Sequence, residues 1–432
     1  MAQKLADLHL ADLHARAAEL AVPRYRLLRR DDLVAAISER GGDSDVTEAE
    51  ADDRESPERE SKPQREAKPE RERLEEAETE DVVGVLEVTP QRYGFLRFAG
   101  LEAQADDVYV SASQIRRCEL RSGDEVAGPV RAPRRGERHR ALVHVDRVNG
   151  REPPTDERPA FDDLTPVLPK RRVPLGESSE VLVRAVDLLT PLALGQRVLV
   201  MAAPRSGRTT LLRALAGAIA AQDGLELIVL LIDERPEEAT AWREALPGCE
   251  IVSATADLPP EDQVRVVDLA AERARRLTES GKDTCLVVDS LSRLAVVSSS
   301  ATGRSRASDV AEVKTLFGSG RELGEEGRGS MTVIATVVEG AEDDGAAERA
   351  VVTTESSLIA LDAGLAAAGV FPALRVAECR VSNEDELRDV EELEAIRRLR
   401  SQLADLDPAE AANLLRERIE GTASNAELLK SL

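Results

Sequence analysis

Short continuous apolar runs, each ending in a glycine turn or an acidic residue, most constrain how this chain can fold. They are Arg197–Met201, Leu227–Ile232, Cys285–Val288 and Thr332–Val337. Such runs, separated by helical segments, are typical of strands that are buried on both faces of a parallel sheet. The sequence therefore predicts an α/β domain over residues 180–432, and the last forty residues of this domain are expected to be mostly helical.

One strand–turn–helix resembles a phosphate-binding loop. The strand expected at Val198–Met201 leads into Ala202-Ala-Pro-Arg-Ser-Gly-Arg-Thr209, and a helix is expected over Thr210–Ile219. The pattern Gly-x-x-x-x-Gly-Lys-Ser/Thr places backbone N–H groups and a helix N-terminus against phosphates, and its hydroxyl against Mg²⁺. The candidate nucleotide-binding residues are Arg205, Ser206, Gly207, Arg208, Thr209 and Thr210, with the Thr209 hydroxyl as a metal ligand.

This loop departs from the pattern at two positions. Ala202 replaces the first glycine, and Arg208 replaces the lysine. Arginine keeps the positive charge, but its guanidinium is larger, planar and less strongly hydrated than an ammonium. Residue chemistry alone thus supports nucleotide binding and disfavours fast hydrolysis. An ordinary strand–turn–helix without a ligand is the alternative interpretation.

Two further strands are followed directly by carboxylates. Asp233 and Glu234 follow Leu227–Ile232, and Asp289 follows Cys285–Val288. Ligands of open parallel sheets bind outside the carboxyl ends of the strands. We expect Asp289 to hold Mg²⁺ and Glu234 to orient or deprotonate the attacking water. The alternative is that these acids only cap the helices that follow.

The N-terminal part of the chain differs in composition. Residues 1–40 show helical spacing of leucines and predict a small helical module, whose role could be docking alone. Residues 41–80 hold 16 acidic and 7 basic side chains and few large apolar ones. Because such a stretch cannot bury enough apolar surface to offset its chain entropy, we expect a disordered acidic linker. Residues 151–179 are predicted to be a second connector.

Residues 81–150 predict a small β-barrel. Several short β-type runs alternate there with Gly, Pro and Asp turns, namely Val82–Val88, Tyr93–Phe98, Asp107–Val110 and Ala141–Val148. Several short strands at this spacing are typical of a small barrel. The whole chain has a net charge of −24, yet this segment holds 10 acidic and 11 basic side chains. The overall charge therefore does not exclude nucleic acid here.

Aromatic residues concentrate in the same segment. Of the nine in the chain, three lie between Tyr93 and Phe98, and Tyr109 follows in the next expected strand. The period of two would place Tyr93, Phe95 and Arg97 on one strand face. Such a face can stack unpaired bases, and the arginines between residues 131 and 140 could contact phosphates. The alternative is an ordinary barrel core beside a solvated basic loop.

Cysteine usage and hydropathy indicate the cellular compartment in which this chain would fold. The four cysteines are far apart in sequence and form no metal-binding spacing with the four histidines. This usage favours a reduced cytoplasm over a disulfide framework or a metal cage. There is no apolar run long enough for a membrane span, and charged residues interrupt the N-terminal stretch where a signal peptide would need an apolar one.

Several longer strings resemble bacterial transcription termination factor Rho. The most specific are Leu231-Ile-Asp-Glu-Arg-Pro-Glu-Glu238 and Val108-Tyr-Val-Ser-Ala-Ser-Gln-Ile-Arg-Arg117, joined by Asp289-Ser-Leu-Ser-Arg-Leu294 and Phe371-Pro-Ala373. The resemblance covers nearly the whole chain, with the acidic linker as an insertion, and it weakens after residue 295. It implies an N-terminal helical module, an OB-fold or cold-shock-like barrel and a RecA-like ATPase domain.

The resemblance further implies a homohexamer that binds single-stranded RNA, hydrolyses ATP with Mg²⁺, translocates and releases transcripts from RNA polymerase. The RNA contacts implied in this way are Tyr93, Phe95, Arg97 and Tyr109. The implied catalytic carboxylate is Glu234, and Asp289 is implied at the metal. An arginine finger from the neighbouring subunit would be Arg375 or Arg380, because the local alignment has an extra residue.

This chain departs from the family pattern in its motor. Besides Arg208, the segment between Arg293 and Phe317 lacks the glycine-rich channel loop, and Thr353-Thr-Glu-Ser356 stands near the place of a Lys-Gly-Thr-Gly loop. A catalytically weak paralogue that binds RNA or a Rho ring is therefore an alternative function. A rotary-ATPase-like subunit is another, but it would lack the RNA-binding barrel.

Overall fold

The computed structural model describes residues 79–155, 157–303, 306–324, 329–340 and 345–432, together with Val34 and Ile37; at 306–309 it describes the backbone only. The chain divides into two compact units, Met1–Ala67 and Lys68–Leu432. All of the structure below belongs to the second unit. The helical module predicted for residues 1–40 and nearly all of the predicted acidic linker lie outside the described residues.

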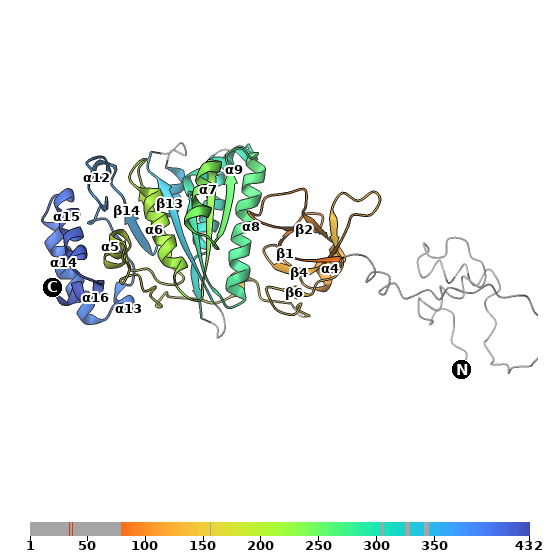
Figure 1. The fold of residues 1–432 in the computed structure, drawn as a ribbon, viewed down its shortest axis with the longest axis horizontal. Coiled ribbons are helices and arrows are strands. Elements are labelled where there is room, and N and C mark those ends of the chain that lie inside the picture. Colours follow the sequence, from red (N-terminus) through yellow and green to blue (C-terminus); the bar gives the residue numbers. More distant parts are fainter. Residues whose placement is uncertain are drawn as a thin grey trace, which may run out of the picture. The chain divides into compact units, whose positions relative to one another are not determined.

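The first part of this unit is a closed five-stranded barrel (Figure 1). Its strands follow the order β1-β2-β3-β5-β4, and β1 pairs with both β2 and β4, which closes the ring. The bounds are β1 Thr79–Val88, β2 Gly94–Arg97, β3 Val108–Val110, β4 Glu125–Arg131 and β5 Arg140–Leu142, with a short β6 (Arg147–Val148) on β4 and helix α4 (Ala112–Arg117) after β3. This topology is that of an OB-fold, as predicted.

Strand β4 was not among the strands expected from the sequence, because Gly128-Pro129 in its centre resembles a turn. Gly128 is required here, since a Cβ at this position would lie 2.2 Å from the carbonyl oxygen of His144. The Pro129 carbonyl accepts a hydrogen bond from Val143 N–H at 2.8 Å. The close approach lets both β5 and β6 pair with β4, so the single strand expected at Ala141–Val148 is two strands.

The second part is an α/β domain built on a nine-stranded sheet in the described residues. Its main path is β10-β9-β11-β13-β8-β14-β15, with parallel pairing from β10 to β14 and an antiparallel β15. The bounds are β7 Pro166–Val167, β8 Arg197–Ala202, β9 Leu225–Glu234, β10 Glu250–Thr255, β11 Asp283–Asp289, β12 Arg321–Leu323, β13 Ser330–Val338, β14 Ser357–Ala360 and β15 Arg380–Val381. The predicted parallel sheet is confirmed.

Helices cover both faces of this sheet (Figure 1). One face packs against α5 (Val181–Leu189), α6 (Arg208–Ala220) and α7 (Pro236–Ala245), with the C-terminal α14 (Val390–Ala404), α15 (Pro408–Glu420) and α16 (Asn425–Lys430) beyond. The other face packs against α8 (Pro260–Glu279), α9 (Leu291–Thr302), α10 (Arg306–Gly318) and α11 (Ala346–Val351). Shorter helices are η3 (Phe161–Asp163), α12 (Ala363–Ala367) and α13 (Glu384–Leu387). The strands whose ends carry the candidate site are therefore packed between two hydrophobic clusters, one on each face of the sheet.

The barrel contacts the α/β domain through α8. Arg121 pairs with Glu279 at 2.7 Å, and Arg273 pairs with Glu125 at 2.6 Å. Gly123 has a φ of +85°, and a Cβ there would lie 2.4 Å from the backbone of Glu272. Two ion pairs and a close backbone approach thus join the two domains.

The four cysteines form no disulfide. Among the described residues, there is no helix with the length and apolar character needed to cross a membrane.

Candidate nucleotide and RNA sites

The phosphate-loop candidate lies between β8 and α6, at the carboxyl edge of the sheet. Gly207 caps α6 with a φ of +93°, in the left-handed region that favours glycine. A Cβ at Gly207 would meet no atom within 4 Å, so open space lies in front of the helix N-terminus. An open pocket of about 790 Å³ is lined by five of the six candidates, Arg205, Gly207, Arg208, Thr209 and Thr210, whereas Ser206 is buried.

Gly207→Ala is expected to raise the dissociation constant for ATP at least about tenfold, because an L-residue in the left-handed region costs about 1–2 kcal/mol and the loop would distort. Equilibrium titration with a fluorescent ATP analogue measures the change. Gly217→Ala on the same helix is the control, since its Cβ would meet only Leu246 at 3.8 Å. Equal affinities for the two variants would contradict the assignment of this loop.

Two acidic strand ends lie beside the loop. Asp289 ends β11 and Glu234 ends β9, and these two strands are neighbours in the sheet. Asp289 is 2% exposed and accepts a hydrogen bond from the Thr336 hydroxyl at 3.0 Å. Burial raises the pKa of Glu234, and Asp289 adds to this rise, while Arg293 and Arg208 oppose it.

Arg208 bridges these two carboxylates. Its Nε lies 3.2 Å from Asp289 Oδ1, and its Nη2 lies 3.4 Å from Glu234 Oε1. Arg293 also pairs with Glu234. The structure therefore brings together Arg208, Glu234 and Asp289 as one charged cluster, and it adds Arg293, which the sequence analysis did not select. The helical spacing of Arg293 after Asp289 could have indicated it.

The donor chemistry at this cluster fits Mg²⁺ only with help from a nucleotide. Thr209 and Asp289 offer the oxygen ligands that Mg²⁺ prefers. Within the described residues there is no group of three or more His, Cys, Asp or Glu side chains that could hold a metal by itself. Phosphate oxygens would have to complete the shell. Arg208 competes for one oxygen of Asp289.

The two arginine-finger candidates are paired with carboxylates of their own chain. Arg375 pairs with Glu339 at 2.6 Å and with Glu378 at 3.5 Å. Arg380 lies on β15 and pairs with Glu355 at 2.7 Å, and 55% of its side chain is exposed. Neither side chain lines the phosphate-loop pocket. A role at a nucleotide would require a second subunit.

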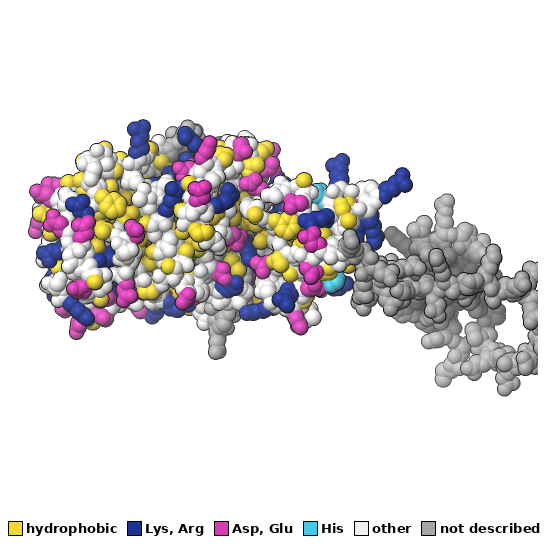
Figure 2. All heavy atoms as spheres, in the orientation of Figure 1, with side chains coloured by type: hydrophobic (Ala, Val, Ile, Leu, Met, Phe, Trp, Pro, Cys, Tyr) yellow, Lys and Arg dark blue, Asp and Glu magenta, His cyan; other side chains and the backbone are white. Residues whose placement is uncertain are grey.

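The aromatic candidates form one cluster on the barrel. The ring centroids of Tyr93, Phe95 and Tyr109 lie 5.7–6.1 Å apart in pairs. Phe95 and Tyr109 are cross-strand partners on β2 and β3, and Tyr109 is 36% exposed. His139 extends the cluster, with its ring 5.0 Å from that of Phe95. Figure 2 shows Lys and Arg side chains projecting from the barrel surface.

Arg97, which was expected to contact RNA, is largely buried in this structure. Its guanidinium lies 5.2 Å over the Phe95 ring, so both side chains share one strand face. However, Arg97 pairs with Glu87 on β1 and with the buried Asp107, and only 7% of its side chain is exposed. The physical reason is that two carboxylates on neighbouring segments of the barrel neutralise the guanidinium in the fold.

Arg97→Met is expected to destabilise the barrel by about 3–5 kcal/mol, because the Asp107 carboxylate would stay buried without its partner. Denaturant unfolding monitored by tyrosine fluorescence measures the loss. Arg140→Met is the control, since Arg140 pairs with an exposed Glu80 and should cost no more than about 1 kcal/mol. An equal, small effect for both variants would contradict a structural role for Arg97.

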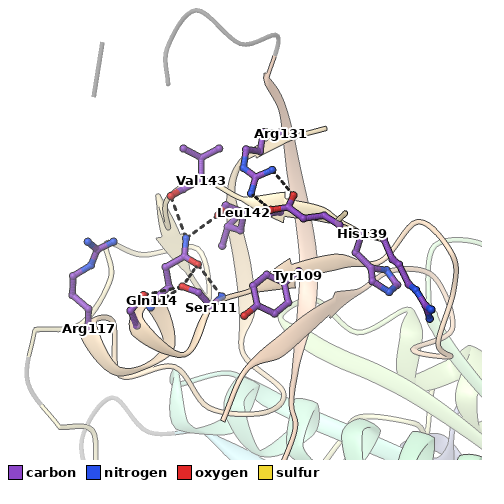
Figure 3. Close-up of a pocket in the computed structure, with 12 residues that line it drawn as sticks. Tyr109, Ser111, Gln114, Arg117, Arg131, His139, Leu142 and Val143 are labelled. Carbon is purple, nitrogen blue, oxygen red and sulfur yellow. Dashed lines mark hydrogen bonds and ion pairs between the residues drawn. The ribbon is translucent and has the colours of Figure 1, made fainter. Parts of the chain in front are cut away.

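A pocket of about 480 Å³ opens beside Tyr109 (Figure 3). Gln114 lies in its wall and donates hydrogen bonds to the carbonyls of Leu142 and Val143 at 3.0 and 3.2 Å. Arg131 and Glu137 pair across its rim at 2.7 Å. Ser111, Ser113, Gln114 and Glu137 also line this pocket, and the sequence pattern assigned none of these four to RNA.

The fold and sites define the class of this protein, a nucleotide-binding α/β domain joined to an oligonucleotide-binding barrel. Residues 183–380 match the family described as "ATP synthase alpha/beta family, nucleotide-binding domain", and residues 82–154 match "Rho termination factor, RNA-binding domain". The chain belongs to the transcription termination factor Rho family.

Similarity over most of the chain supports this assignment. Transcription termination factor Rho of Rhodopirellula baltica is 39% identical over 367 residues, covering 81% of this chain and 71% of the relative. The factor of Chromobacterium violaceum is also 39% identical (81% and 87% covered), and that of Bacillus subtilis is 38% identical (82% and 86%).

Solved structures agree with the fold. A prototypical ATPase from a type III secretion system aligns with a TM-score of 0.52 at 21% identity, over 67% of this chain and 93% of that one. The assembled ATPase EscN of enteropathogenic Escherichia coli aligns at 0.51 and 19%, over 81% and 93%.

Proposed function

We propose that this chain is an RNA-dependent ATPase that terminates transcription. It captures single-stranded RNA on the barrel, hydrolyses ATP in the α/β domain, translocates along the RNA and releases the transcript from RNA polymerase. The observation that carries this proposal is the presence, in one compact unit, of the partly exposed aromatic cluster and of the phosphate loop with its two acidic strand ends. The working form is a cytoplasmic homohexamer.

Each nucleotide-site residue has a distinct role in this proposal. The backbone amides from Ser206 to Thr209 bind the phosphates, together with the α6 N-terminus. Mg²⁺, held by Thr209 and Asp289, would neutralise charge on the phosphates. Glu234 orients or deprotonates the attacking water. Arg380, more exposed than Arg375, is the better candidate for a finger that reaches the neighbouring subunit's nucleotide.

RNA binding depends on the barrel face. Tyr93, Phe95 and Tyr109 stack on bases, and the basic side chains of residues 131–140 contact phosphates. Arg97 acts as a positioning residue for Phe95.

Release of transcripts from stalled elongation complexes tests the proposal. Purified protein with ATP is expected to release RNA from immobilised RNA polymerase, whereas a non-hydrolysable ATP analogue should give no release. Bound RNA without any ATP-dependent release would contradict the proposal. That result would favour a binding protein with a weak motor, which is the second candidate suggested by the contacts of Arg208 with Glu234 and Asp289.

A further inference from the structure

The position of Arg208 is the starting observation. In the phosphate-loop pattern a lysine at this place contacts phosphates, and Mg²⁺ lies between those phosphates and the acidic strand end. Here the Arg208 guanidinium lies 3.2 Å from Asp289 and 3.4 Å from Glu234. A positive charge of this chain's own therefore already lies against the carboxylate expected to face the metal.

The charge around the pocket points in the same direction. Four arginines line it together with the carboxylate of Asp233, namely Arg205, Arg208, Arg235 and Arg293. The Glu234 and Asp289 carboxylates, which pair with Arg208, are not among the lining residues. Arginine stays protonated at all accessible pH values. These cations would attract a polyphosphate even when no divalent ion screens it from Asp289.

The shape of the side chain matters as well as its charge. A guanidinium presents donors in a planar fork, so one group can face two acceptors at once, and its outer N–H groups remain available for a phosphate. The single ammonium of lysine is a point charge and cannot span Asp289 and Glu234 in the same way.

We propose that Arg208 is a built-in cation between Asp289 and the bound phosphates, so that this chain binds a nucleoside triphosphate without a divalent metal ion. The inference rests on the proposed nucleotide site and concerns how that site is occupied. In this proposal, nucleotide binding needs no divalent metal ion, whereas hydrolysis uses one.

The test is the dissociation constant of a fluorescent N-methylanthraniloyl ATP, measured with the full chain in excess magnesium chloride and in excess EDTA. For the unaltered protein the two values should agree within about threefold. For Arg208→Lys, the dissociation constant in EDTA should exceed that in magnesium at least about tenfold, a difference of about 1.4 kcal/mol. Arg213→Lys is the matched control, because Arg213 lies on the same helix and pairs with Glu238 outside the pocket.

The outcomes are distinguishable. Binding by the unaltered protein in magnesium but not in EDTA would overturn the inference and leave the proposed function in place. Metal-independent binding by Arg208→Lys would also overturn it, since the arginine would then not be the cause. Absence of binding in both buffers would overturn the inference and the proposed nucleotide site together. Retained RNA binding shows that each variant is folded.

Discussion

Replacement of Glu234 by glutamine is expected to lower the ATP turnover number by about 100-fold or more, the range of a lost general base. The carboxylate ends β9 beside Asp289, where an attacking water would meet the terminal phosphate. Glutamine keeps the size of the side chain but accepts no proton. Phosphate release at saturating RNA and ATP measures the effect.

The matched control for this variant is Glu238→Gln. Glu238 belongs to the same acidic string, yet it lies on α7 and pairs with Arg213. This variant should keep its turnover within about twofold, because a surface ion pair contributes little. Full activity of Glu234→Gln would contradict the assignment of the base and would direct attention to another group.

The same residue predicts a pH dependence. Burial raises the pKa of Glu234, and the base must be deprotonated to act. Turnover should therefore decline as the pH falls through this raised pKa, at higher pH than for an ordinary glutamate. The acidic limb should disappear in Glu234→Gln, whose small residual rate lacks the titrating carboxylate.

Replacement of both Phe95 and Tyr109 by alanine is expected to weaken binding of single-stranded RNA by about 100-fold, because each stacked base contributes about 1–3 kcal/mol. The two rings are cross-strand partners and form one surface with Tyr93. Fluorescence anisotropy with a labelled pyrimidine-rich RNA measures the loss.

The control pair is Phe95→Tyr with Tyr109→Phe, which exchanges a hydroxyl and keeps both rings. Its RNA affinity should stay within about threefold of the unaltered protein. Turnover without RNA should be unchanged in both double variants, since the barrel holds no part of the nucleotide site. Unchanged RNA affinity in the alanine variant would show that this surface does not bind RNA.

Local pattern predicted much of this fold. The runs that became β8, β9, β11 and β13 are continuous and apolar because each strand is buried on both faces. Strand β4 was missed because Gly128-Pro129 resembles a turn, although in the barrel that glycine permits a close strand approach. The helical module predicted for residues 1–40 remains a prediction.

The sequence predicted where the candidate site residues lie in the fold, but it did not predict which side chains contact one another. Parallel strands bring their carboxyl ends together, so Glu234 and Asp289 had to lie near the phosphate loop. Which partner neutralises which charge is set by tertiary packing. For this reason the pairing of Arg97 with Asp107, the bridge from Arg208 and the nearness of His139 to Phe95 appear only in the fold.

The central claim is that RNA bound on the barrel activates ATP hydrolysis in the α/β domain of the same chain. Its most direct test is the ATP turnover of the purified full chain with and without a long cytidine-rich RNA. Turnover that rises at least about tenfold with RNA, and that falls again in the Phe95→Ala, Tyr109→Ala variant, is the expected result. Tight RNA binding with no ATP turnover in either condition would contradict the claim.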